Sequence, residues 1–396
     1  MTAPITGLRV LDLTRALAGP FCSMMLGDMG ADIIKVEQPG VGDNSRAWGP
    51  PFLGGESSYF LSVNRNKRSI AINLRDPHGA EILSRLVAQS DILLENFVPG
   101  SLDRLGFSYA DCHKLKPDLI YCAISGFGQV GPDRERAAYD QIAQGIGGVM
   151  SVTGEIGGPP MRVGIAIADI MAGMFAGYAV MSALYHRQAT GAGQFIDTSL
   201  LDGQLAMMTY QAGRYLATGE VPGSSGNHHP TIVPYGVYKA SDGYLNLAVG
   251  TEDLWRRFCT ALAIEHVRDD PRFATNSQRQ AHRDALNTLI EPLFAARTAA
   301  EIDTLMNEYG IPCGAVLDLQ GVFRNPQVAA IGAVQTMAHP TAGEIQFVGP
   351  PYRLSATPAE VRIPPPLLGQ HTDEILRSLA YSDEQIAALR QSRIVA

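Results

Sequence analysis

The hydrophobic positions in the first third of the chain fall into short apolar runs separated by segments of helical periodicity. The runs are typical of buried strands and lie at 8–14, 31–37, 69–74, 91–96 and 118–128. The segments 19–29 and 76–89 carry helix signals, because a proline stands at or near the start of each. Strands that alternate with helices predict a parallel sheet covered on both faces, with ligands at the carboxyl ends of its strands.

The least charged stretch of the chain lies near its middle. Residues 163–185 contain Asp169 as their one charge, and the pattern predicts a buried helix that ends before Gly191. Its uncharged part, 170–185, is 16 residues long and therefore short of a membrane span. We expect a core helix and no membrane partner.

A turn-rich segment at 221–230 separates the alternating strands and helices before it from a different pattern of secondary structure after it. The residues after it, 235–250, predict an antiparallel hairpin, and several helices follow to about Glu308. Three consecutive prolines at 364–366 predict an extended strap, and a final helix is expected from Ser382. The resulting division is a large α/β domain over 1–220, a small α+β domain with linkers over 221–330, and a C-terminal segment over 331–396.

Composition narrows the classes of function. The chain has 396 residues, of which 46% are hydrophobic, and its net charge of −8 argues against nucleic acid as a partner. The five cysteines are scattered without metal-ligand spacing, and the first residues lack the pattern of a secretion signal. We expect a cytoplasmic protein that binds no metal.

Asp169 is the most informative single residue. A carboxylate at the start of an uncharged helix is either an N-cap or a nucleophile, and the local pattern leaves both open. Gly173 and Gly177 follow on the same helical face, which lets a ligand or another segment approach the backbone closely. The positive end of the helix is expected to keep the carboxylate ionised.

Basic residues gather near the ends of the predicted strands. They are Arg15, Arg46, Arg65, Lys67, Arg68, Arg75 and Arg104. Each alone is better explained as an ordinary solvated charge, but the grouping favours a polyphosphate ligand. The first strand–helix turn, TRALAGPFCSMMLG, lacks the glycine fingerprint of a dinucleotide site.

Eight stretches between residues 7 and 376 share their pattern with one enzyme family. They read GLRVLDLTRALAGPFC, GADIIKVEQPGVGD, NRNKRSIAINL, ENFVPGSLDRLGF, GFGQVGP, the Asp169 helix, VPYGVYKASDG and PPPLLGQHTDEIL. Together they resemble the class III CoA-transferases, the group of formyl-CoA transferase and the carnitine CoA-transferases. The stretches WGPPFLGGESSYFLSVNRNK and PPPLLGQHT look closest to the succinate–hydroxymethylglutarate branch, which works on dicarboxylates.

The resemblance implies a fold and an assembly. The family has a Rossmann-like large domain, a smaller domain, and a C-terminal segment that returns to the large domain. Two chains thread through each other as interlocked rings, so a homodimer is expected. The implied substrates are acyl-CoA and carboxylic acids, with no permanently bound cofactor.

The resemblance also implies roles for individual residues. Asp169 falls on the catalytic aspartate, which forms aspartyl anhydride and aspartyl-CoA thioester intermediates. Tyr139 matches a tyrosine beside the reacting centre. The positions that match CoA contacts are Ala18, Ile72, Arg75, Asn96, Phe97 and Arg104. The chain departs from the family pattern at three positions, which leaves the exact phosphate contacts open: Leu17, Gln38 and Ala137.

The expected reaction moves CoA from succinyl-CoA to a short dicarboxylate such as glutarate, hydroxymethylglutarate or itaconate. A dicarboxylate needs cations or N–H groups for its distal carboxylate, and the candidates are Arg46, Arg65, His228 and His229. The family's glycine-rich lid is absent, and Gly250 in LAVGTEDLW is the local candidate for it.

Two alternatives remain beside the transferase. A 2-methylacyl-CoA racemase of the same superfamily needs a histidine where this chain has Tyr139, and tyrosine is a poor base at neutral pH. A non-catalytic CoA-binding protein would not need Asp169. The sequence favours the transferase.

Overall fold

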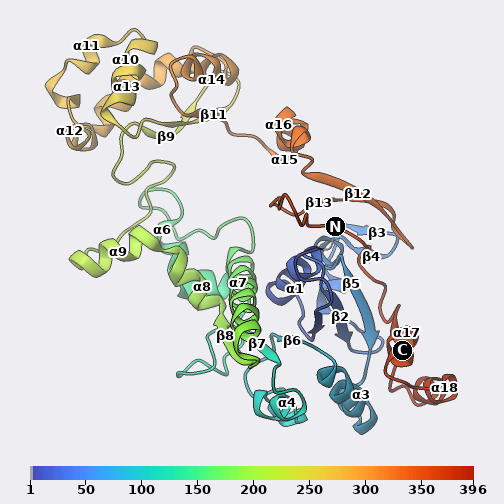
Figure 1. Ribbon diagram of the computed structural model, residues 1–396. Coiled ribbons are helices and arrows are strands. Elements are labelled where there is room, and N and C mark those ends of the chain that lie inside the picture. Colours follow the sequence, from blue (N-terminus) through green and yellow to red (C-terminus); the bar gives the residue numbers. More distant parts are fainter. Residues whose placement is uncertain (1–2) are drawn as a thin grey trace. The chain divides into compact units, whose positions relative to one another are not determined.

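The computed structural model describes residues 3–396 and separates them into two compact units (Figure 1). The larger unit comprises the chain up to residue 150 together with 162–220 and 329–396. The smaller unit comprises 151–161 and 221–328. The chain therefore passes from the larger unit to the smaller one twice, at 151–161 and at 221–328, and each time returns to the larger one.

A six-stranded parallel sheet forms the centre of the larger unit, as the alternating pattern predicts. Its order is β5-β2-β1-β6-β7-β8. The strands are β1 (Arg9–Asp12), β2 (Asp32–Glu37), β5 (Lys67–Ala71), β6 (Ile92–Glu95), β7 (Ile120–Ser125) and β8 (Gln194–Ser199). The strands β2 and β5 lie on one side of β1, whereas β7 and β8 lie on the far side of β6. The strand order therefore reverses between β1 and β6, which is the switch point of the sheet.

Helices cover both faces of this sheet. They are α1 (Ala18–Asp28), α2 (Ser58–Val63), α3 (Pro77–Ala88), α4 (Tyr109–Leu115), α5 (Asp140–Ile146), α7 (Ile167–Thr190), α8 (Leu200–Met207), α17 (Thr372–Ser378) and α18 (Asp383–Gln391). Helix α9 (Thr209–Thr218) follows α8 and buries none of its residues. Helix α6 (Val149–Val152) spans the boundary between the units.

Successive residues of the strands point alternately into two hydrophobic cores. Leu11 and Leu13 point to the core that contains residues of α3, α4, α17 and α18. Val10 points to the other core, which contains residues of α1, α5, α7 and α8. Strands that bury both faces read as continuous apolar runs, and the sequence prediction was right here for this reason.

The smaller unit is built on an antiparallel sheet in the order β11-β10-β9. Its strands are β9 (Tyr235–Lys239), β10 (Tyr244–Ala248) and β11 (Cys313–Ala315), so the predicted hairpin over 235–250 is confirmed. The helices are α10 (Glu252–Ala261), α11 (Glu265–Arg268), α12 (Asn276–Ala281), α13 (Arg283–Ala295), α14 (Ala299–Glu308) and α15 (Leu319–Arg324). Trp255, Phe258 and Phe294 lie in its core.

The C-terminal segment runs along the edge of the large sheet. After α16 (Pro326–Ala330) it forms an antiparallel hairpin, β12 (Val334–His339) and β13 (Gly343–Val348), which the sequence pattern did not predict. The proline segment 364–366 has no regular secondary structure, in agreement with an extended strap. The Asn66 side chain accepts from the backbone N–H of Arg362, and the Arg46 guanidinium donates to the Pro366 carbonyl at 3.0 Å. A second short hairpin, β3 (Phe52–Leu53) and β4 (Glu56–Ser57), precedes α2.

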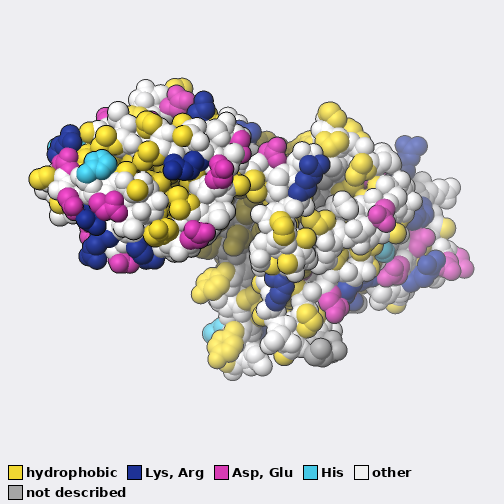
Figure 2. Space-filling view, turned by 90° about the horizontal axis from the view of Figure 1, so that it is seen from above, with side chains coloured by type: hydrophobic (Ala, Val, Ile, Leu, Met, Phe, Trp, Pro, Cys, Tyr) yellow, Lys and Arg dark blue, Asp and Glu magenta, His cyan; other side chains and the backbone are white. Residues whose placement is uncertain are grey.

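Helix α7 is the one helix among residues 3–396 that is long and apolar enough to cross a membrane by length and composition. Core helices of globular proteins show the same pattern, and α7 contributes Ala168, Ala172, Ala176, Val180 and Ala183 to the core shared with α1. On the face drawn in Figure 2, cationic and anionic side chains are interspersed, with hydrophobic side chains between them.

Candidate active site

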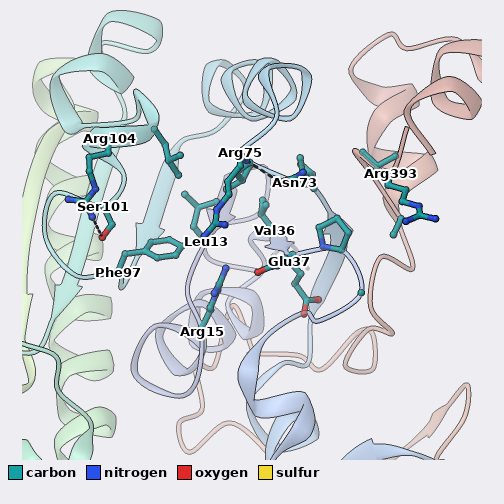
Figure 3. A pocket seen from close by; sticks show the side chains of 18 of the residues that line it. Leu13, Arg15, Val36, Glu37, Asn73, Arg75, Phe97, Ser101, Arg104 and Arg393 are labelled. Carbon is teal, nitrogen blue, oxygen red and sulfur yellow. Dashed lines mark hydrogen bonds between the residues drawn. The ribbon is translucent and has the colours of Figure 1, made fainter. Parts of the chain in front are cut away.

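The carboxyl ends of β1, β2, β5 and β6 surround a pocket of about 1090 Å³ (Figure 3). The residues after β1 and β6 meet here, at the switch point where open α/β sheets bind ligands. The Asn96 side chain accepts from the Arg15 backbone N–H at 2.9 Å and donates to the Arg15 carbonyl at 2.8 Å. The loop that carries Arg15 and the loop that carries Phe97 are thereby held together.

The pocket is rich in arginine. Arg15, Arg75, Arg104 and Arg393 line it, and none of them has a carboxylate partner within residues 3–396. The Arg15 guanidinium lies 5.3 Å from the centre of the Phe97 ring, and Arg104 donates to the Ser101 hydroxyl at 3.1 Å. Unpaired guanidinium groups beside an aromatic ring suit a ligand that carries phosphates and a flat base.

Four of the six predicted CoA contacts line this one pocket, namely Ile72, Arg75, Phe97 and Arg104. Asn96 acts on it through the Arg15 backbone, as described above. Ala18 is buried in the first turn of α1. Arg15, which the sequence placed among the basic residues near the strand ends, also lines the pocket. Nothing in the sequence indicated Arg390 or Arg393, because they reach the pocket through contacts between distant segments.

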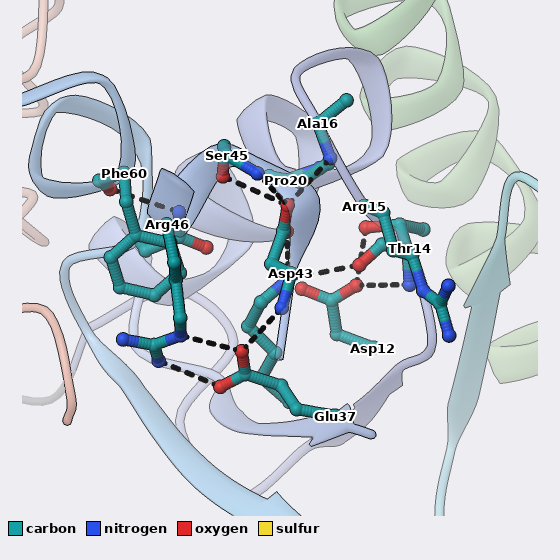
Figure 4. Close-up of polar contacts among 12 residues, drawn as sticks. Asp12, Thr14, Arg15, Ala16, Pro20, Glu37, Asp43, Ser45, Arg46 and Phe60 are labelled. Atoms are coloured by element: carbon teal, nitrogen blue, oxygen red, sulfur yellow. Dashed lines mark hydrogen bonds and ion pairs between the residues drawn. The ribbon is translucent and has the colours of Figure 1, made fainter. Parts of the chain in front are cut away.

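A network of buried charges lies beneath the loop that carries Arg15 (Figure 4). Lys35 and Asp43 are fully buried and form an ion pair of 2.8 Å between Nζ and Oδ2. Lys35 also donates to the Thr14 carbonyl at 2.9 Å, and Asp43 accepts from the Ala16 N–H at 3.0 Å. Burial alone would raise the pKa of Asp43, but the Lys35 ammonium holds that pKa well below its usual range. The network therefore stays ionised and fixes the backbone from Thr14 to Ala16.

Arg46, a predicted substrate contact, belongs to the same network. Its Nε and Nη2 donate to the two oxygens of Glu37 at 2.8 and 2.7 Å, and its guanidinium lies 3.7 Å from the centre of the Phe60 ring. Arg65, the other candidate, makes the same bidentate contact with Asp28 at 3.0 and 2.7 Å. A substrate carboxylate would have to displace Glu37 or Asp28 to reach either guanidinium.

Asp169 is not the N-cap of its helix. Ala166 occupies the cap position, so Asp169 is the third residue of α7, and no hydrogen bond from residues 3–396 reaches its half-buried carboxylate. Burial, followed by the charge of Asp140, raises the pKa of Asp169 to about 7. The expectation that the helix end keeps this carboxylate fully ionised was therefore wrong, because desolvation and a like charge outweigh the helix dipole.

Asp140 takes the capping role that the sequence left open for Asp169. Its Oδ1 accepts from the Ala168 N–H at 2.8 Å, and its Oδ2 accepts from the Gln144 side chain at 2.7 Å. The Gln144 oxygen in turn accepts from the Val163 N–H at 2.9 Å. Both side chains are buried, so they hold the chain that leads into α7 without using Asp169 as a cap.

The two glycines after Asp169 serve helix packing. A Cβ atom at Gly173 would lie 2.4 Å from the Ala18 carbonyl oxygen, and one at Gly177 would lie 3.1 Å from the Met25 side chain. Helix α1 is therefore the segment that approaches this face. The loop before α1 also connects the two parts of the site, since Arg15 lines the pocket and Leu17 belongs to the cluster of Ala166 and Ile170 that flanks Asp169.

Aromatic rings stand beside this end of α7. The Trp48 ring centre lies 5.0 Å from that of Tyr59 and 6.5 Å from that of the exposed Tyr139. Tyr59 packs in the same cluster as Ala166 and Ile170, and burial, followed by the charge of Asp169, raises the pKa of Tyr59 to about 12. The family resemblance pointed to Tyr139, whereas the sequence pattern indicated no role for Trp48 or Tyr59, because a lone aromatic residue carries no local signal.

The remaining predicted substrate contacts, His228, His229 and Gly250, belong to the smaller unit. His228 pairs with Gly236 in an isolated bridge, and the His229 Nδ1 accepts from the Ile232 N–H at 3.1 Å. Gly250 is exposed, and a Cβ atom there would meet nothing within 4 Å. Their role in substrate binding stays a prediction.

Comparison with known proteins decides the family. The model of CoA-transferase family III matches residues 5–372. The chain belongs to CoA-transferase family III. It is therefore an enzyme that transfers CoA between acids, and CoA thioesters are its substrates, as the motifs predicted.

Relatives and solved structures match over nearly the whole chain. A succinyl-CoA:glutarate CoA-transferase of Mus musculus is 45% identical over 96% of this chain and 87% of its own length. A succinate–glutarate CoA-transferase of Agrobacterium fabrum is 41% identical over 95% of this chain and 96% of its own length. The crystal structure of a CAIB/BAIF family protein from Brucella suis has a TM-score of 0.86 at 39% identity and covers 96% of this chain and 100% of its own.

Proposed function

We propose that this CoA-transferase moves CoA from succinyl-CoA to a short dicarboxylate such as glutarate, with Asp169 as the nucleophile. The observation that carries the proposal is the Asp169 carboxylate, which is half-buried and receives no hydrogen bond from residues 3–396. Its neighbours Ala166 and Ile170 pack with Leu17, on the loop whose Arg15 lines the arginine-rich pocket. The names of the relatives support the choice of substrates.

The reaction follows from an ionised carboxylate beside a thioester. Asp169 attacks the thioester carbonyl, the C–S bond breaks, and CoA leaves as thiolate while a mixed anhydride remains. The thiolate attacks the Asp169 carbonyl and expels the donor acid as its carboxylate, which leaves an aspartyl-CoA thioester. The acceptor carboxylate attacks this thioester and releases the thiolate again. Finally the thiolate attacks the acceptor acyl group and frees Asp169.

The environment of Asp169 favours these steps. A carboxylate whose pKa is about 7 is more basic than an ordinary aspartate, and it is still ionised in about half of the molecules near neutral pH. Removal from water also protects the anhydrides from hydrolysis. The arginines of the pocket are placed to hold the phosphates of CoA.

An acceptor panel with succinyl-CoA as donor tests the substrate class. A distal-carboxylate site discriminates strongly against acids that leave its polar groups unpaired, so glutarate should be used far better than valerate or butyrate. Equal efficiency with glutarate and valerate would move the assignment to a monocarboxylate transferase. Epimerisation of a 2-methylacyl-CoA without any free acid would favour the racemase instead.

We also propose the interlocked homodimer that the resemblance implies. Large apolar side chains lie exposed on the larger unit, including Tyr178 and Tyr185 on α7 and Leu216 on α9, which are 75%, 78% and 81% exposed. Exposed apolar patches of this kind mark protein interfaces. Light scattering should give twice the chain mass at every dilution that keeps activity, and an active monomer would contradict the proposal.

A further inference from the structure

The last residues of the chain close one side of the arginine-lined pocket. Val395 pairs antiparallel with Ile72, and the Asn73 N–H donates to the Ile394 carbonyl at 2.8 Å. Ile394 and Val395 are buried in the same core as Ile72. The tail is thus fixed to the residues that follow β5, and Ile72, Asn73 and Val395 all line the pocket.

Arg393 lies directly before the paired residues Ile394 and Val395. Its backbone N–H donates to the Arg390 carbonyl at 2.9 Å, and its φ of 56° turns the chain from the end of α18 into the paired segment. Arg390 is neutralised by Asp373 at 2.7 Å, whereas Arg393 has no carboxylate partner in the described chain. Figure 3 shows Arg104 and Arg393 on opposite sides of the pocket, with Arg75 and Arg15 between them.

The charge balance of the pocket points to an anion with several phosphates. Glu37 lines the pocket, but its two oxygens are occupied by Arg46. Ala396 also lines it, and its carbonyl oxygen accepts from the Thr372 hydroxyl at 2.6 Å. The four guanidinium groups that have no carboxylate partner among residues 3–396 dominate the charge of the pocket. A chain with a net charge of −8 therefore keeps one strongly cationic cavity.

We infer that Arg393 binds a phosphate of CoA, so that the segment after α18 is part of the CoA site. The inference rests on the proposed function for the identity of the ligand. CoA carries a pyrophosphate and a 3′-phosphate, and guanidinium groups on both sides of the pocket can hold them in separate places.

The test compares Arg393→Gln and Arg393→Glu with a matched control. Arg377→Gln is the control, because Arg377 lies on α17, is paired with Asp383 at 2.8 Å, and does not line the pocket. Calorimetry with free CoA should give a dissociation constant raised about tenfold in Arg393→Gln and more in Arg393→Glu. Arg377→Gln should bind as the wild type does, and Arg393→Lys should recover part of the affinity. Unchanged melting temperatures show that the variants are folded.

Dephospho-CoA, which lacks the 3′-phosphate, locates the contact. If Arg393→Gln and the wild type bind dephospho-CoA equally, the partner is the 3′-phosphate, and if the difference persists, it is the pyrophosphate. Either result supports the inference. Wild-type affinity for CoA in both folded Arg393 variants would overturn it and leave the proposed function intact, whereas a wild-type protein that binds no CoA would remove the proposed function itself.

Discussion

Asp140 accepts a hydrogen bond from the backbone N–H of Ala168 at 2.8 Å, and this places a buried carboxylate beside the helical turn that carries Asp169. The contact fixes the start of α7 without using Asp169 as a cap. The charge of Asp140 adds to burial in raising the pKa of Asp169 to about 7. One carboxylate therefore positions the helix, and the other remains free and unusually basic.

The pH dependence of turnover should reflect the raised pKa of Asp169 and the effect of Asp140 on it. Only ionised Asp169 can attack the thioester, so kcat/KM is expected to fall about tenfold for each unit of pH well below 7. In Asp140→Asn the amide oxygen can still accept from Ala168, but the neighbouring charge is gone. The acidic limb of the profile should then move to lower pH. An acidic limb that stays in place would show that Asp140 does not act on Asp169.

The pH dependence of the free energy of unfolding should also reflect the raised pKa of Asp169. The pKa of Asp169 is about 7 in the folded protein against 3.8 for a free carboxyl, so the folded state binds more protons between these values. Its stability therefore falls as pH rises from about 4 to about 7, and the cost remains above that. Asp169→Asn should stabilise the protein at pH 8 by on the order of 1 kcal/mol and change little at pH 4. Thermal melts at the two pH values measure the difference, and a destabilised variant at pH 8 would contradict the assignment.

Arg75 and Arg104 should affect binding more than chemistry. Both line the pocket without a carboxylate partner among residues 3–396, and Asp169 is not among the residues that line it. Replacing either by glutamine should raise the KM for succinyl-CoA about tenfold, the effect of one lost charge-assisted contact. Steady-state kinetics against the Arg377→Gln control decide the point. Unchanged KM values in both variants would refute their role.

Gly173→Ala should disturb the contact between α1 and α7. The new Cβ would lie 2.4 Å from a backbone oxygen, that of Ala18, which cannot move as a side chain can. We expect a loss of about 1–3 kcal/mol of stability. Gly213→Ala on α9 is the control, because its Cβ meets nothing within 4 Å and alanine is the better helix former. Equal melting temperatures for the two variants would contradict this prediction, because they would show that α1 and α7 accommodate the added methyl group at no cost in stability.

The sequence predicted those features that depend on local pattern. The parallel sheet followed from apolar runs between helices, and the 235–250 hairpin followed from its turn residues. Asp169 stood out because an uncharged helix contains a single carboxylate. The C-terminal hairpin was missed because its strands are mostly exposed and form no continuous apolar run that would mark them.

The features that the sequence missed depend on contacts between distant segments. The pKa of Asp169 follows from Asp140, which tertiary structure brings beside α7. Arg393 enters the pocket because Val395 pairs with Ile72 at the other end of the chain. Arg46 was a plausible substrate ligand as an isolated arginine, and only the fold shows that Glu37 already holds it.

The central claim is that Asp169 becomes covalently bound to CoA during turnover. Intact-mass spectrometry of the protein mixed with succinyl-CoA, followed by peptide mapping, measures this directly. We predict an adduct with the mass of CoA less one water on the peptide that contains Asp169, released by glutarate and absent in Asp169→Asn. An active wild-type enzyme that never carries such an adduct, or a folded Asp169→Asn protein that still turns over, would contradict the mechanism.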